Sequence, residues 1–206
     1  MDGVGDRTIR VDLQLIANMI EPRTRVLDVG CGDGALLDYL WHFKEVDGRG
    51  MEISTEGVNA CVSAGLSVVQ GDADTDLKDY PDLAFDYVVL SQTLQATRAP
   101  RTMLEHLTRI GRHAIVSFPN FAHWRARLYL AFQGRMPVND ALPYQWYDTP
   151  NIHLCTIQDF MDLCEKLGIS IVQSLALDHR GRARRIRSGS AIANLLGTQA
   201  VFLLKK

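Results

Sequence analysis

RVLDVGCGDGALLDYLWHFK, residues 25–44, joins a short apolar run, three closely spaced glycines and an amphipathic segment. The run Arg25 to Gly30 contains one acid among apolar, mostly β-branched residues, which predicts a buried strand. Apolar residues at helical spacing from Ala35 to Lys44 predict a helix. A strand that turns through glycines into a helix is typical of the first unit of an open α/β domain.

The same alternation extends along the chain in both directions. Before residue 25, an amphipathic helix carries Ile9, Leu13, Ile16 and Ile20 on one face and ends at Pro22. Further strands are predicted at 50–53, 66–70, 85–91, 113–118, 169–177 and 200–204, and further helices at 54–64, 100–110 and 156–167. Strands separated by amphipathic helices predict a doubly wound, mostly parallel sheet of the α/β class. The last two strands are free to pair antiparallel at the sheet edge.

Residues 119–155 differ in composition from the rest of the chain, because aromatic residues, histidines and prolines are concentrated there. We expect this segment to be an insertion, a lid or a partner-binding segment, within one domain spanning residues 1–206; a small core packed on the sheet is the alternative. Acid–base candidates in the segment are His123, Tyr144, Tyr147 and His153. For each of them a structural role is the competing interpretation.

The amino-acid composition limits the classes of protein to which the chain can belong. The 206 residues are 47% hydrophobic and 22% charged, which is typical of one globular domain and excludes a disordered chain. No apolar run approaches the roughly 18 residues of a membrane span, and the start MDGVGDRTIR lacks the order of a secretory signal. We therefore expect a cytoplasmic protein without membrane contact. Cys31, Cys61, Cys155 and Cys164 are scattered, which predicts reduced thiols and no metal site.

The net charge and the sequence after the strand 85–91 both argue against nucleic acid as a partner. The formal net charge is -2, and SQTLQ after the strand 85–91 has neither the Asn/Asp-Pro-Pro-Tyr motif nor the Pro-Cys nucleophile of DNA methyltransferases. Residues 179–187 nevertheless carry five arginines, without which the net charge would be -7. This basic loop is either a solvated edge or a site for a phosphate-bearing ligand or an acidic partner.

The glycine turn predicts a ligand site, since such sheets bind ligands beyond the carboxyl ends of their strands. Residues 30–35 also match the dinucleotide pattern G-x-G-x-x-A, and Glu52 follows Gly30 by 22 residues. A pyrophosphate there would face the carboxylates of Asp28 and Asp33, which repel it. A ligand with ammonium and sulfonium charges would be attracted, so the charges favour S-adenosylmethionine (SAM) over NAD(P).

The signature Asp-x-Gly-x-Gly-x-Gly at 28–34, the acid Glu52 and the Gly71-Asp72-Ala73 sequence resemble the class I SAM-dependent methyltransferases. The resemblance implies that Asp28 and the glycines line the methionine moiety, that Glu52 binds the ribose hydroxyls, and that Asp72 and Ala73 lie against the adenine. Asp72 also begins an acid-rich stretch whose members from Asp74 to Asp82 we expect to be a solvated loop. The expected cofactor-binding residues are Asp28, Gly30, Cys31, Gly32, Gly34, Glu52, Ile53, Asp72, Ala73 and Ser91.

A narrower resemblance rests on strings outside the glycine turn. SQTLQ, SFPNFAHW and YDTPNIH, together with VLDVGCGDGALL, are similar to the MetW family of methionine biosynthesis proteins, from about Arg10 to Leu175. Ala122 stands where this family usually has Gly, and the basic loop lies outside the strong match.

The MetW resemblance implies a SAM-binding protein that works with homoserine O-acyltransferase (MetX) and supports homoserine acylation. Two functions remain open. In the first, the chain is a regulatory subunit that binds SAM, the end product, and contacts the acyltransferase through residues 119–155. In the second, it is a methyltransferase acting on a small molecule beneath that segment. A homodimer is open as well.

Overall fold

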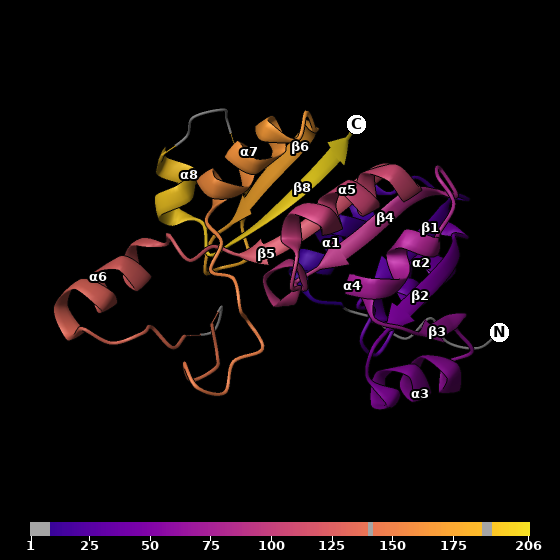
Figure 1. The fold of residues 1–206 in the computed structure, drawn as a ribbon, viewed down its shortest axis with the longest axis horizontal. Coiled ribbons are helices and arrows are strands. Elements are labelled where there is room, and N and C mark those ends of the chain that lie inside the picture. The colour runs from indigo at the N-terminus through magenta and orange to yellow at the C-terminus, as the bar shows by residue number, and fades with distance from the viewer. Residues whose placement is uncertain (1–8, 140–141, 187–190) are drawn as a thin grey trace.

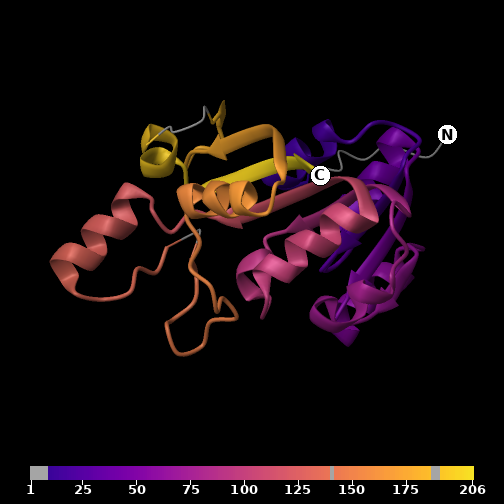
Figure 2. The same cartoon turned by 45° about the horizontal axis from the view of Figure 1, so that its top comes forward.

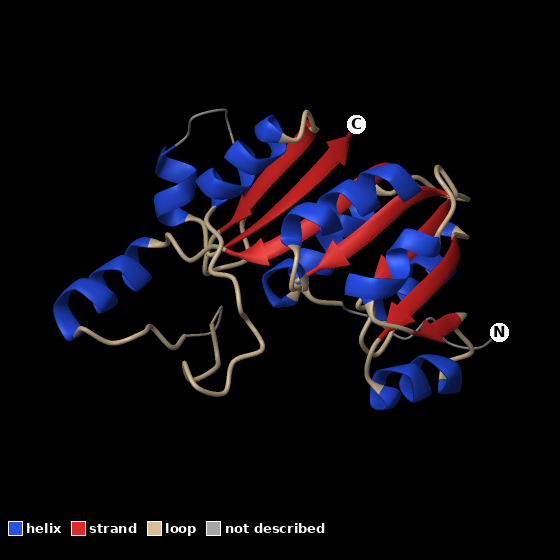
Figure 3. Cartoon of the chain, viewed as in Figure 1, coloured by secondary structure: helices blue, strands red, loops and turns tan. Residues whose placement is uncertain are grey.

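The computed structural model describes residues 9–139, 142–186 and 191–206, which form one eight-stranded sheet with helices on both faces (Figures 1 and 3). The strands are β1 (Arg25–Val29), β2 (Asp47–Glu52), β3 (Val68–Gln70), β4 (Phe85–Ser91), β5 (Gly111–Pro119), β6 (Ser170–Leu177), β7 (Ala183–Arg185) and β8 (Gln199–Lys205). The helices are α1 (Val11–Met19), α2 (Ala35–Lys44), α3 (Thr55–Ser63), α4 (Ala73–Asp76), α5 (Pro100–Ile110), α6 (Trp124–Gln133), α7 (Ile157–Lys166) and α8 (Ala191–Leu196), with short 3-10 turns η1 (Leu77–Asp79) and η2 (Leu94–Ala96).

The strand order β3-β2-β1-β4-β5-β8-β6-β7 confirms the predicted mostly parallel α/β sheet. Strands β1 to β5 are parallel, and Asp28 of β1 lies in register with Gly50 of β2 and Val89 of β4. Their side chains alternate between two cores. One core lies beneath α1 and α2 and the other beneath α5 and α7, so the central strands are apolar on both faces.

The last strands pair antiparallel, as predicted, but β8 does not lie at the edge. It runs between β5 and β6, antiparallel to both. Residues Ala200 to Leu204 are buried on both faces of β8, and such a strand needs neighbours on both sides. The antiparallel edge strand is β7, which forms from residues 183–185 of the basic loop. Arg187 of that loop lies outside the described residues.

Residues 119–155 form an extended arm. Within α6 only Ala126 is buried, and Figure 2 shows the helix standing away from the sheet. Trp146 is 73% exposed in the loop that follows. The alternative of a small core packed on the sheet is therefore wrong for the described part of this segment. The arm returns to the body where the amides of Ile152 and His153 donate to the Gln95 carbonyl, at 2.9 and 3.0 Å.

The structure contains no helix, among the residues it describes, that is long and apolar enough to cross a bilayer.

Asn120, at the end of β5, joins three segments of the carboxyl-terminal half. Its buried side-chain amide donates to the carbonyls of Asn194 and Gly197, each at 2.8 Å. Its carbonyl oxygen accepts from the backbone amides of Ala122 at 3.1 Å and Ile157 at 3.3 Å. One side chain thus satisfies four backbone groups where the arm, α7 and α8 meet.

We expect Asn120→Ala to destabilise the protein by about 3 kcal/mol, because it leaves two carbonyls and two amides without partners in a buried site. Urea denaturation measures the change. The control is Asn18→Ala on the exposed face of α1, which we expect to change the free energy of unfolding by about 0.5 kcal/mol or less. Equal midpoints for the two variants would contradict this role of Asn120.

Candidate functional site

The glycine turn between β1 and α2 is fastened to the end of β2. The amides of Gly30 and Cys31 both donate to the Met51 carbonyl, at 2.8 and 3.2 Å. Gly30 has a φ of +71°, and a Cβ there would lie 2.8 Å from Thr93 Oγ1, so close packing and backbone conformation both require glycine. Gly32, with a φ of +56°, differs because a Cβ there would meet no atom of the described residues within 4 Å. The turn therefore presents open space at Gly32.

Glu52, the last residue of β2, bonds to the turn and to the next helix. Its Oε2 accepts from the Gly32 amide at 2.9 Å, and its Oε1 accepts from the Ser54 amide at 2.8 Å. Both carboxylate oxygens are thus held by backbone amides. The arrangement keeps a nearly buried acid at the carboxyl end of β2, beside the open space at Gly32.

Asp28 lies beneath the turn with a carboxyl group that is not fully paired. The residue is 3% exposed, and its Oδ1 has no hydrogen-bond partner among the residues that the structure describes. Burial, and secondarily the Glu52 carboxylate, raise the pKa of Asp28 to about 7. A buried acid in this state is stabilised by any cationic or hydrogen-bond donor group that reaches it.

Asp72 is the N-cap residue of α4 and lies two residues after the end of β3. Its Oδ1 accepts from the Asp74 amide at 3.0 Å, and its own amide donates to Asp76 Oδ2 at 2.9 Å. The Asp74 carboxylate in turn accepts from the Arg98 amide at 3.0 Å. Residues Asp74 to Asp82 were expected to be a solvated loop. Asp74 and Asp76 instead accept hydrogen bonds from the local backbone within and beside α4. Asp82 is solvated as expected, with 72% of its side chain exposed, and it pairs with Arg109 at 2.6 Å.

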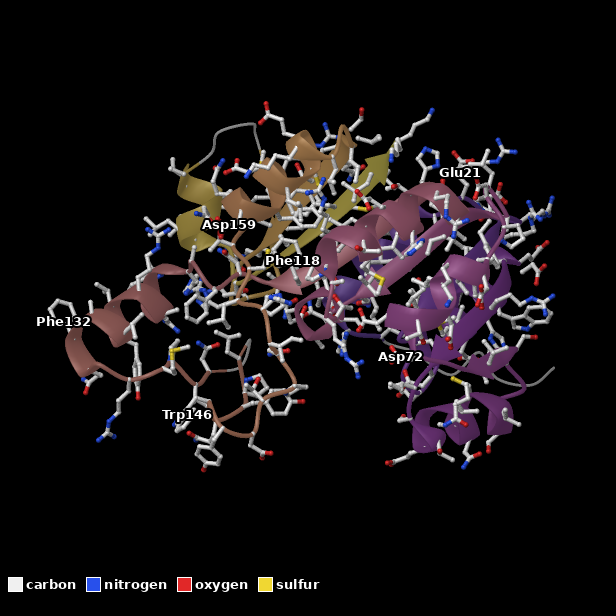
Figure 4. All side chains as sticks on the ribbon, viewed as in Figure 1. Glu21, Asp72, Phe118, Phe132, Trp146 and Asp159 are labelled. Atoms are coloured by element: carbon white, nitrogen blue, oxygen red, sulfur yellow. The ribbon has the colours of Figure 1, made fainter. Side chains whose placement is uncertain are left out.

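A cavity of about 210 Å³ lies at the carboxyl ends of β1, β2 and β3. The predicted residues Gly30, Ile53, Asp72 and Ala73 line it together. Strand order reverses between β1 and β4, and ligands of open α/β sheets bind at such a switch point. Figure 4 shows Asp72 at this end of the sheet, far along the molecule from Phe132 of the arm.

The other predicted cofactor residues lie around the cavity rather than in its lining. Asp28, Gly32, Gly34 and Glu52 form the turn and its support. The Cys31 side chain lies in an apolar cluster with Leu37 and Cys61, and burial raises the pKa of its thiol. Ser91, at the end of β4, is bonded to Ser117 with 3.2 Å between the two hydroxyl oxygens. Cys31 and Ser91 therefore direct their side chains to other residues.

The four acid–base candidates do not form one cluster. His123 is buried and accepts from the Arg125 amide at the start of α6, and burial, followed by Arg125 and His179, lowers its pKa. Tyr144 and Tyr147 are exposed on the arm. His153 is the candidate placed beside the cavity, since its Nε2 lies 3.4 Å from the carbonyl of Arg98, a lining residue.

Sequence reasoning missed the wall that follows β4. Thr93, Ala96 and Arg98 line the cavity, and Thr93 packs against Gly30. The string SQTLQ contains Thr93, and its position directly after a parallel strand was the available signal. Within residues 9–139, 142–186 and 191–206 no group of three His, Cys, Asp or Glu side chains is arranged to hold a metal ion.

Solved structures share this fold. A SAM-dependent methyltransferase from Thermotoga maritima, described as a possible histamine N-methyltransferase, superposes with a TM-score of 0.68 at 18% identity. The match covers 95% of this chain and 87% of that one. At this identity the likeness establishes a class I SAM methyltransferase fold and nothing about the substrate.

Two curated relatives are similar in sequence. The bifunctional methionine biosynthesis protein MetXA/MetW of Rhodopirellula baltica is 35% identical over 182 residues, which are 84% of this chain and 29% of that protein. A fatty-acid O-methyltransferase of Mycolicibacterium smegmatis is 43% identical over 70 residues, which are 32% of this chain and 25% of that protein. This chain thus matches less than a third of the length of either relative.

The sequence profile of the family described as methionine biosynthesis protein MetW matches residues 10–204, which is nearly the whole chain. The match includes the glycine turn, the wall after β4 and the arm. The chain belongs to the MetW family.

Proposed function

We propose that this chain binds SAM at the cavity beside the glycine turn and acts with homoserine O-acyltransferase (MetX) to support or regulate homoserine acylation. In this proposal residues 1–206 act as one cytoplasmic domain, and residues 119–155 are its partner-binding segment. SAM is the end product of the pathway and serves here as a regulatory ligand.

The unpartnered carboxyl oxygen of Asp28 is the observation that carries the ligand assignment. An ammonium group near it supplies the missing partner and favours the ionised form, as the methionine moiety of SAM would. Glu52, already bonded to the turn, would accept from ribose hydroxyls, and Asp72 with Ala73 would lie against the adenine. Asp28 with the glycines, Glu52, and Asp72 with Ala73 therefore offer groups suited to the methionine moiety, the ribose and the adenine of SAM.

The geometry of α2 argues against a dinucleotide. A pyrophosphate of NAD(P) binds the free amides at the start of the first helix. Here Asp33 Oδ1 accepts from the Ala35 amide at 3.1 Å, so a carboxylate already occupies that position. Displacing it would bring two anions together in a confined site.

The partnership with an acyltransferase is supported by the fused relative. Its name joins MetXA and MetW in one chain, and the part similar to this protein is 29% of its length. Fusion raises the effective concentration of two partners, which is useful when they act together.

A methyltransferase acting on a small molecule is the second candidate. When bound, SAM would supply an electrophilic methyl group for transfer to an acceptor. The similarity to a fatty-acid O-methyltransferase over 70 residues favours this candidate, as does His153 beside the cavity. His153 would then orient the acceptor or hold its proton.

We expect Asp28→Asn to stabilise the free protein at pH 8 and to weaken SAM binding at least tenfold. A raised folded-state pKa means that wild type loses stability as pH rises from about 4 to about 7, by at most about 4 kcal/mol. Asparagine cannot ionise, so the free energy of unfolding of the variant, relative to that of wild type, increases across this pH range. Urea denaturation at pH 5 and 8 and calorimetric titration with SAM measure the two effects.

The matched control for Asp28→Asn is Asp33→Asn, which keeps a side-chain acceptor at the exposed start of α2. For wild type we also expect tighter SAM binding at pH 7.5 than at pH 6, because more Asp28 is ionised. Unchanged SAM affinity in Asp28→Asn would contradict the assignment of this carboxyl group.

We expect Gly32→Leu to abolish SAM binding, because the new side chain enters the open space at the turn. Gly65→Leu is the matched control: Gly65 has a φ of +75° and open space around its Cβ, but it lies at the end of α3. Both variants carry similar backbone strain of about 1–2 kcal/mol. Calorimetric titration distinguishes them, and retained affinity in Gly32→Leu would place the ligand elsewhere.

Co-purification with homoserine O-acyltransferase, followed by acylation assays with and without SAM, tests the function. We expect a complex whose acylation rate changes when SAM is added, since regulation requires different SAM affinities in the free and bound states. No association together with unchanged acylation would exclude the regulatory proposal. Transfer of a labelled methyl group into a defined metabolite would establish the second candidate instead.

A further inference from the structure

Helix α6 is apolar on more than one face, and the described part of the molecule buries Ala126 alone among its residues. Every residue from 127 to 136 is exposed, and Phe132 is 80% exposed. Leu128, Tyr129 and Leu130 are consecutive residues, so their side chains point in different directions around the helix. Isolated helices of ten residues are marginal in water, and an apolar surface of this kind is normally buried. The helix has the character of an element that enters a groove of another molecule.

The exposed apolar surface continues from α6 onto α8. A cavity joins the two helices, with Trp124 at the start of α6 and Ile192 and Leu196 of α8 in its walls. Ile192 is also largely exposed. We call the surface made by α6, by β7 with the preceding Arg182, and by α8 the arm face. It lies at the end of the molecule opposite β3 (Figure 1).

The arm face is basic as well as apolar. Arg182, Arg184 and Arg185 line the cavity between α6 and α8, and Arg125 lies with its guanidinium carbon 5.4 Å from the Trp124 ring centre. Within the described ranges, none of these arginines forms an ion pair. The sequences of α6, β7 and α8 contain no acid. One acid, Asp178, is among the described residues that line the cavity, and its Oδ1 accepts from the backbone amides of Arg180 and Arg182 at 2.8 and 3.0 Å, so arginines still outnumber acids there. A matching surface must therefore supply carboxylates around an apolar groove.

Several other occupants fit this surface less well. Single-stranded nucleic acid would stack on the aromatic rings but leave the aliphatic side chains of α6 and α8 in water. A second copy related by a two-fold axis would bring the same arginines together. A protein with an apolar groove rimmed by acids satisfies both the charge and the apolar area.

We propose that α6 docks into such a groove on homoserine O-acyltransferase, with β7 and α8 contacting its acidic rim. The inference rests on the proposed function and adds the surface that performs it. The arm also ends at the wall of the cofactor cavity, because Ile152 and His153 bond to Gln95 in η2, between the lining residues Thr93 and Arg98. The end of the arm and a ligand in the cavity would thus contact one wall.

The test measures the affinity of the full chain for the acyltransferase by calorimetry, using Phe132→Asp and Leu128→Asp. We expect each to weaken binding at least 100-fold, since charged groups replace central apolar anchors. The control is Trp41→Asp on α2, because Trp41 is an aromatic residue of similar exposure, 62%, outside the arm face. All three variants are expected to bind SAM as wild type does, which shows that the domain remains folded.

A second pair of variants tests the basic part of the surface. Arg182→Glu and Arg184→Glu should weaken binding at least tenfold and reduce its dependence on salt, because fewer charge pairs remain to be screened. Arg49→Glu is the control, since Arg49 lies on β2, away from the arm face, and pairs with Asp47. We expect it to leave the affinity unchanged.

The outcomes separate this inference from the proposed function. If wild type binds the acyltransferase and the α6 variants bind equally well, the docking surface is wrong and the function stands. If wild type does not bind the acyltransferase, both are overturned. A wild-type dimer that Phe132→Asp dissociates, or flotation of the chain with anionic phospholipid vesicles that Phe132→Asp prevents, would assign the arm face to a second copy or to a membrane and overturn the inference.

Discussion

The attachment of the glycine turn to the end of β2 is the constraint on which the candidate site depends. Two amides of the turn share the Met51 carbonyl, and a third, from Gly32, donates to Glu52. Parallel pairing of β1 with β2 brings these groups to one edge of the sheet. The same attachment positions Asp28 beneath the turn and Gly30 against Thr93, so the turn, its acids and the wall after β4 form one assembly.

Asn120 has a comparable connecting role in the carboxyl-terminal half of the molecule. It satisfies backbone groups of the arm, α7 and α8 at the point where β5 ends. The arm therefore leaves the body from a hydrogen-bonded base, although α6 itself buries little. A helix that gains little stability from its own domain is well placed to gain more from a partner, provided its base does not move when the partner binds.

The parallel half of the sheet follows closely from local sequence patterns. The strands at 25–29 and 85–91 and the helices at 35–44 and 100–110 agree with the predicted ranges, because each is read from apolar periodicity and its bounding residues. Local patterns were less informative after residue 177. The position of β8 inside the sheet, the pairing of β7 and the helix α8 depend on contacts between residues far apart in the chain, which periodicity does not report.

For the site, the sequence by itself determined the residues on which the proposal is built, a glycine turn and acids at 28, 52 and 72, whose charges favour a cationic ligand. Residue type and spacing suffice because these groups follow consecutive parallel strands, whose ends must meet. Tertiary structure alone decided that Cys31 and Ser91 turn to other partners, that Arg98 and Thr93 complete the wall, and that α6 is exposed. Those outcomes depend on which surfaces pack against one another in the folded chain. Composition does not report this, because an aromatic segment has the same composition whether it is buried or exposed.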